Sequence, residues 1–140
     1  MPYKFILVPL TIIIISQILK LVTDSIKGNF NLKSVLNSYG GMPSSHAALV
    51  ASISTITAVQ SGINSIPFAI CLVFSILILR DATGLRMVTE KQSIAINKLI
   101  KQLPIDNQKN FALQTESVGH TYSEILAGIV LGVVLTWVLV

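Results

Sequence analysis

The chain has 140 residues, of which 52% are hydrophobic and 11% are charged. Soluble domains contain about 25% charged residues, so this composition excludes an ordinary soluble protein and indicates an integral membrane protein with one domain, residues 1–140. The formal net charge is +4, but the basic residues lie beside apolar segments and are not interleaved with aromatic residues. A nucleic-acid partner is therefore not expected, and anionic lipid head groups are the better partner.

Four segments are apolar over about 20 residues, which is the length that a membrane-spanning helix needs. They cover approximately residues 4–22, 44–62, 66–87 and 120–140. The first resembles a signal peptide, but no small-x-small cleavage site follows it, so we expect it to span the membrane. The sequence thus predicts an all-α integral membrane protein with four transmembrane helices in a bundle and one or two short interfacial helices.

Near the end of the first segment, Ser16, Gln17 and Lys20 recur at near-helical spacing. Side chains at this spacing share one face of a helix. We expect this face to lie against protein.

The stretch from Gly40 to His46 lies between two apolar segments and has the character of a site. Gly40 and Gly41 permit backbone angles that are closed to other residues, and Pro43 suits the first position of a helix. The outward amides at such a helix start, together with the helix dipole, favour phosphate. They belong to Ser44, Ser45 and His46. The His46 ring could also exchange a proton with the anion.

The third apolar segment is interrupted by Arg80 and Asp81 and is followed by Arg86. Charges inside or at the edge of the hydrocarbon are costly, so they are usually paired or functional. Asp81 is expected to form an ion pair with Arg80 or Arg86. The alternative is that Asp81 helps to bind Mg²⁺, which prefers carboxylate and phosphate oxygens.

Residues 88–119 form the longest stretch that does not span the membrane. Thr89-x-x-Gln92 has the form of a capping box, so we expect a helix to begin there and to end before Pro104. Its isoleucines and leucines form a broad apolar side, with lysines elsewhere, which predicts an interfacial helix. The last span carries Gly128-x-x-x-Gly132, which is a weak helix-packing signal.

The distribution of lysines predicts the orientation of the chain. With four spans, residues 23–43 and 88–119 lie on one side of the membrane, and they hold Lys27, Lys33, Lys91, Lys98, Lys101 and Lys109. The other side holds only Lys4. The positive-inside tendency places both connections in the cytoplasm. The polar segments at residues 40–46, 80–86 and 119–124 then meet at the cytoplasmic end, where we expect one site.

The chain contains two histidines, His46 and His120, each at the start of a predicted helix. With Lys20 and Arg86 at the same membrane level, they supply what phosphoryl transfer needs: a nucleophile, an acid, and cations for the nonbridging oxygens. Glu124 lies four residues after His120, so it could accept the other ring N–H and orient the imidazole. Alternatively, Thr121-x-x-Glu124 is itself a capping box.

Several motifs resemble the divergent branch of the type 2 phosphatidic acid phosphatase and vanadium haloperoxidase superfamily. They are Gly-Gly-Met-Pro-Ser-Ser-His-Ala at 40–47, Asp-Ala-x-Gly-x-Arg at 81–86, Gln92, and Gly-His-Thr-x-x-Glu at 119–124. The resemblance implies that His120 is the nucleophile, Glu124 orients it, and His46 is the general acid. It also implies phosphate-binding residues, for which the candidates are Lys20, Arg86, Gly40, Gly41, Ser44 and Ser45.

The chain departs from the pattern of the superfamily at two positions. Gln114 occupies the place of the third motif's arginine, so Arg86 is expected to supply that charge. Lys20-x₆-Lys27 imitates the spacing of the first motif but lacks its Arg-Pro. We assign no catalytic role to Arg80.

The leading hypothesis is a membrane phosphatase that hydrolyses a lipid phosphate monoester or diphosphate through a phosphohistidine. By resemblance it needs no metal or other cofactor, and its substrate is phosphatidylglycerophosphate, phosphatidate or a polyprenyl diphosphate. The alternative is a noncatalytic protein that binds lipid head groups or anions, or a transporter component. A purely structural four-helix protein would explain the spans but not the clustered polar motifs.

Overall fold

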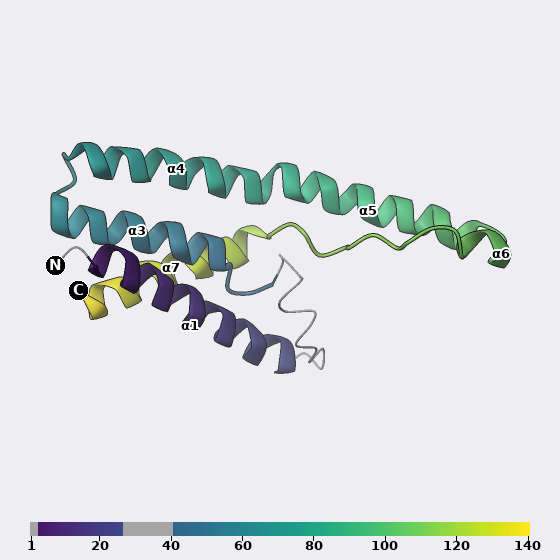
Figure 1. Ribbon diagram of the computed structural model, residues 1–140, viewed down its shortest axis with the longest axis horizontal. Coiled ribbons are helices and arrows are strands. Elements are labelled where there is room, and N and C mark those ends of the chain that lie inside the picture. The colour runs from purple at the N-terminus through teal and green to yellow at the C-terminus, as the bar shows by residue number, and fades with distance from the viewer. Residues whose placement is uncertain (1–2, 27–40) are drawn as a thin grey trace.

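The computed structural model describes residues 3–26 and 41–140, and every regular element in these two ranges is a helix (Figure 1). The helices are α1 (Lys4–Ile26), α3 (Ser45–Ser61), α4 (Ile66–Thr83), α5 (Leu85–Gln102), α6 (Ile105–Gln108) and α7 (Tyr122–Leu139). The predicted all-α fold is confirmed for this part of the chain. Gly40 and Lys27 lie outside the described residues, so their predicted roles stay predictions.

Three helical stretches within the described ranges are long and apolar enough to cross a membrane. They are Lys4–Ser25, Ile66–Gln102 and Tyr122–Leu139, in agreement with the first, third and fourth predicted spans. Helix α3 has 17 residues, slightly fewer than the roughly 20 that a membrane-spanning helix needs. The second predicted span, residues 44–62, therefore stays a prediction.

Helix α3 is the centre of the bundle and contacts α1, α4 and α7. Figure 1 shows α4 along one side of α3 and α1 with α7 along the other. Ala47 and Ala48 on α3 are fully buried between these helices. Their side chains are small, so the neighbouring helices can approach closely. Hydroxyl groups add contacts between the helices: Thr136 donates to Ser52 over 2.8 Å. Such hydrogen bonds strengthen helix association in lipid.

Helices α3 and α7 touch through their backbones at Gly128 and Gly132. A Cβ atom added to Gly128 would lie 2.4 Å from the carbonyl oxygen of Ser44, and one added to Gly132 would lie 2.4 Å from that of Ala48. No carbon atom fits at these distances. The helix-packing role predicted for the two glycines is thus confirmed.

Gly132→Val should destabilise the protein by about 1–3 kcal/mol, because the added side chain pushes α7 away from the carbonyl of Ala48. Equilibrium unfolding in mixed micelles would measure the change. Val138→Leu on the same helix is the matched control, since Val138 is 76% exposed and its replacement overpacks nothing. Equal stability of the two variants would contradict the backbone contact.

Helices α4 and α5 form one long rod that extends beyond the bundle (Figure 1). The turn between them is tight, because the Gly84 N–H donates to the carbonyl of Arg80 over 2.8 Å and Val88 bonds back to Gly84. Helix α5 thus begins at Leu85 and not at the predicted Thr89-x-x-Gln92 box. The predicted helix start at Thr89 is wrong, because the chain becomes helical again directly after Gly84. The predicted end before Pro104 is confirmed, whereas the interfacial position of this helix stays a prediction.

Candidate active site

The two histidines face each other at one end of the bundle. His46 lies in the first turn of α3, and His120 lies two residues before α7. Their ring centroids are 6.1 Å apart with an edge-on arrangement of 62°. The His46 Nδ1 and His120 Nε2 atoms are buried and have no hydrogen-bond partner within the described residues. A buried polar atom without a partner costs free energy. This pair of ring nitrogens is therefore suited to a ligand that supplies polar atoms to both.

The carboxylate of Glu124 orients His120. The distance from His120 Nδ1 to Glu124 Oε2 is 3.2 Å, and the same oxygen accepts the Thr121 N–H over 3.0 Å. The Thr121 hydroxyl in turn accepts the Glu124 N–H, which completes the capping box. The capping box of Glu124 is thus confirmed, and the same carboxylate oxygen also contacts His120. Because an ionised carboxylate only accepts hydrogen bonds, this contact places the His120 proton on Nδ1 and leaves the Nε2 lone pair available.

His120 precedes the apolar helix α7, and its side chain is almost completely buried. Burial lowers the pKa of His120 below its usual value, against the opposing effects of the hydrogen bond and the charge of Glu124. The ring is therefore neutral at pH 7, as a nucleophile must be.

The backbone before His120 is held by α4 and α5. The His120 N–H donates to the carbonyl of Ala82 over 3.3 Å. The carboxylate of Glu90 accepts the N–H groups of Val118 and Gly119 over 3.1 and 2.9 Å. We did not predict this role of Glu90 from the sequence. Its position four residues after Arg86 was the available signal, because residues at this spacing share a helix face.

The side chain of Lys20 on α1 packs against Gly41, in the loop that precedes α3. The side chain of Lys20 is charged but only 3% exposed, and a Cβ on Gly41 would lie 2.6 Å from its Cε atom. Gly41 also has a φ of +112°, which other residues rarely adopt. The Thr23 hydroxyl donates to the carbonyl of Met42 over 2.7 Å, so α1 is tied to this loop. The charge of Lys20 acts on Glu124 and on both histidines.

The serines at the start of α3 have different roles from those predicted. Ser44 is the N-cap, so the helix begins at Ser45, two residues later than the expected start at Pro43. The Ser44 N–H donates to the carbonyl of Glu124 over 3.0 Å and so joins the two histidine-bearing segments. This amide is therefore engaged and does not point toward an anion. The amides of Ser45 and His46 have no carbonyl partner within the helix, because they lie in its first turn.

Asp81 forms the expected ion pair, and its partner is Arg86. The Arg86 Nε atom lies 2.8 Å from Asp81 Oδ2, whereas Arg80 is exposed. The charge of Arg86 acts on both His46 and His120. In the described part of the chain, no three or more His, Cys, Asp and Glu side chains form a group that could hold a metal ion.

Gln114, which has the sequence position of the third motif's arginine, is bonded through its backbone to α5. Its N–H donates to the Asn97 side chain, which in turn donates to the Gln114 carbonyl, both over 2.8 Å. Asn97 lies eleven residues after Arg86 on α5, which is about 16 Å along a helix. The guanidinium whose charge acts on both histidines is that of Arg86, whereas the Gln114 backbone is bonded to Asn97 farther along α5.

These features define an all-helical integral membrane protein with a two-histidine polar centre at one end of its bundle. The chain belongs to the divergent PAP2 family, whose model matches residues 2–135. It is 33% identical to the uncharacterized membrane protein YuiD of Bacillus subtilis (strain 168), over 93% of this chain and 89% of that protein. None of the solved structures matches it. The family resemblance of the motifs is thus confirmed.

Proposed function

We propose that the protein is a phosphatase that hydrolyses the phosphate monoester or diphosphate of a membrane lipid through a phosphohistidine on His120. One observation carries this proposal: two buried ring nitrogens, His46 Nδ1 and His120 Nε2, have no partner among the described residues while the rings lie 6.1 Å apart. A phosphate group that reached both nitrogens would give each of them the polar partner that it lacks.

The reaction begins when the His120 Nε2 lone pair attacks phosphorus. The bond from phosphorus to the lipid oxygen breaks, and protonated His46 gives its proton to that oxygen, so the lipid leaves as an alcohol or as a shorter phosphate. Glu124 holds the Nδ1–H and stabilises the cationic phosphoimidazole. Lys20 and Arg86 stabilise the nonbridging oxygens as their charge changes.

The second step regenerates the enzyme. Neutral His46 takes a proton from water, and the resulting hydroxide attacks the phosphohistidine. The bond from phosphorus to His120 Nε2 breaks, and inorganic phosphate leaves. His46 is then protonated again for the next cycle, so one imidazole acts first as acid and then as base.

Purified protein in mixed micelles should release phosphate from phosphatidylglycerophosphate, phosphatidate or a polyprenyl diphosphate. A phosphorylated histidine should be trapped by rapid quenching at alkaline pH, and vanadate should bind with trigonal-bipyramidal geometry.

The second candidate function is noncatalytic binding of lipid head groups. It is favoured by the sequence, which has Gln114 where the superfamily's third motif has an arginine that binds phosphate. Tight head-group binding without turnover would decide for it.

Glu124→Gln should lower kcat/KM by about tenfold and shift the acid limb of its pH profile to lower pH. The active His120 is neutral, so activity falls as pH decreases through its pKa. The glutamate raises that pKa, and its replacement therefore lowers it. Glutamine still completes the capping box, which protects the fold.

The matched control is Thr121→Ala, which weakens the same cap and leaves the carboxylate in place. Its acid limb should match that of the unmodified protein. Because the substrate's own ionisation is common to all three proteins, it cancels in the comparison. A shift to higher pH in Glu124→Gln would contradict the assigned contact.

We further propose that α3 also crosses the membrane, as the second of the four predicted spans, and that the site faces the cytoplasm. The contacts of α3 with α1, α4 and α7 support this placement. In a Cys71→Ser background, a cysteine at exposed Asn107 should be shielded from impermeant thiol reagents in intact cells. A cysteine at Ile63, between α3 and α4 at the other end of the bundle, should be labelled. The reverse pattern would overturn the orientation.

A further inference from the structure

An apolar groove of about 540 Å³ runs along α7. Met42 and Ser123 line one end, and apolar residues of α7 from Leu126 to Leu135 line the rest. Apart from Met42, its lining residues belong to α7, which is long and apolar enough to cross a membrane, so its natural contents are hydrocarbon.

One end of the groove lies beside the two segments that carry the histidines, because Met42 and Ser123 are close in sequence to His46 and His120. Met42 and Ser123 flank the hydrogen bond that joins the Ser44 N–H to the Glu124 carbonyl. Below them, Ala127 and Leu131 are three and seven residues after Glu124, and this spacing places them on the same face of α7. A molecule whose phosphate lies at the histidines can therefore extend directly into the groove.

The length of the groove corresponds to one leaflet of a bilayer. From Ser123 to Leu135 there are twelve helical steps, or about 18 Å at roughly 1.5 Å per residue. Half of a hydrocarbon core that is roughly 30 Å thick is about 15 Å. A single lipid chain that starts at the site would fill the groove.

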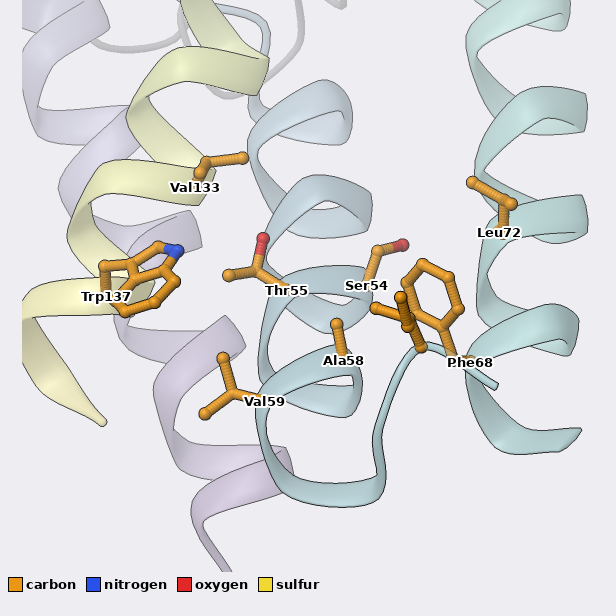
Figure 2. A pocket seen from close by; sticks show the side chains of 9 residues that line it. Ser54, Thr55, Ala58, Val59, Phe68, Leu72, Val133 and Trp137 are labelled. Carbon is orange, nitrogen blue, oxygen red and sulfur yellow. The ribbon is translucent and has the colours of Figure 1, made fainter. Parts of the chain in front are cut away.

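Two other apolar hollows do not share this connection. One of about 530 Å³ lies at the far end of the bundle, between Trp137 of α7, the end of α3 and the start of α4 (Figure 2). The other, about 330 Å³, lies on α4 between Ile66 and Phe74. Neither contains a residue of the polar segments that form the site.

We propose that the groove along α7 holds one hydrocarbon chain of the lipid whose phosphate group lies between His46 and His120. This inference rests on the proposed phosphatase function and assigns the substrate class: a long-chain lipid phosphate that enters from the bilayer and not a water-soluble phosphate ester. The histidines select the phosphate group, and α7 selects the chain.

A bulky residue in the groove should separate chain recognition from chemistry. Val130→Trp should lower kcat/KM for long-chain phosphatidate by about tenfold or more, the effect of losing the burial of about two methylene groups. It should leave kcat/KM for a water-soluble short-chain phosphatidate unchanged. Val73→Trp on α4 is the matched control, because the two valines are 54% and 57% exposed on apolar helices. It should change neither value. An equal loss on both substrates in Val130→Trp would overturn the groove assignment.

Photocrosslinking keeps the groove testable if the protein proves to have no phosphatase activity. A phosphatidate with a diazirine in one chain should label α7 between Leu126 and Leu135 more than α4. Unlabelled phosphatidate should compete, and phosphatidylcholine with the same chains should not. Absence of turnover with this pattern would reject the phosphatase and keep the groove. Equal labelling of α4 and α7, or equal competition by both lipids, would reject the groove.

Discussion

Replacing His120 with alanine should abolish phosphate release from every lipid phosphate that the protein hydrolyses, with a decrease of about a thousandfold or more. The substitution removes Nε2, the buried nitrogen that has no partner in the described part of the chain. It also removes the contact to Glu124, whose carboxylate still closes the helix cap through Thr121. Phosphate release and the yield of trapped phosphohistidine would both be measured.

His46→Ala provides the internal comparison for that experiment. It should lose hydrolysis of lipid esters, whose leaving oxygen needs a proton, but still form phosphohistidine from p-nitrophenyl phosphate, whose leaving group does not. Because water activation is also lost, the phosphorylated protein should accumulate. Normal lipid hydrolysis by His120→Ala would exclude His120 as nucleophile. Identical behaviour of the two variants on p-nitrophenyl phosphate would remove the distinction between nucleophile and acid.

Arg86→Gln should reduce kcat/KM by about 100-fold, which is typical for the loss of one preorganised donor to a developing anion. The charge of Arg86 acts on both imidazoles, so a phosphate between the rings lies within its reach. Steady-state phosphate release from the best lipid substrate would measure the effect.

Two controls separate phosphate binding from the ion pair. Asp81→Asn breaks the same 2.8 Å contact but keeps the guanidinium, so its loss should be much smaller. Gln114→Ala should change kcat/KM by less than about twofold, because this residue is exposed and is bonded to Asn97. If Asp81→Asn were as damaging as Arg86→Gln, the pair would be structural.

The helices could be predicted from the sequence because apolar runs of membrane length leave few alternatives. The predicted ends were accurate where residues stop a helix, as at Pro104. They were wrong where the chain resumes a helix after one glycine, as at Gly84. Composition cannot show whether the segment from Arg80 to Arg86 interrupts a helix or continues it.

The contact between His120 and Glu124 was predictable because both residues belong to one helical turn. The approach of His46 to His120 followed from topology, since both lie at the starts of helices that begin at the same end of the bundle. Three other contacts depend on how separate segments meet. Glu90 accepts the backbone N–H groups before His120, Asp81 pairs with Arg86 and not with Arg80, and Lys20 packs on Gly41. A single sequence contains no periodicity that encodes those distances.

The glycine contacts between α3 and α7 have a consequence for how this site can change. His46 is on α3 and His120 directly precedes α7, and the backbones of these two helices touch at Gly128 and Gly132, so main-chain contact helps to set the separation of the rings. Arg86 is carried by the neighbouring rod of α4 and α5, which meets the segment before His120 through Ala82 and Glu90. Substitutions on that rod away from Ala82 and Glu90 can therefore change the electrostatic field at the two rings while the separation of the rings stays constant.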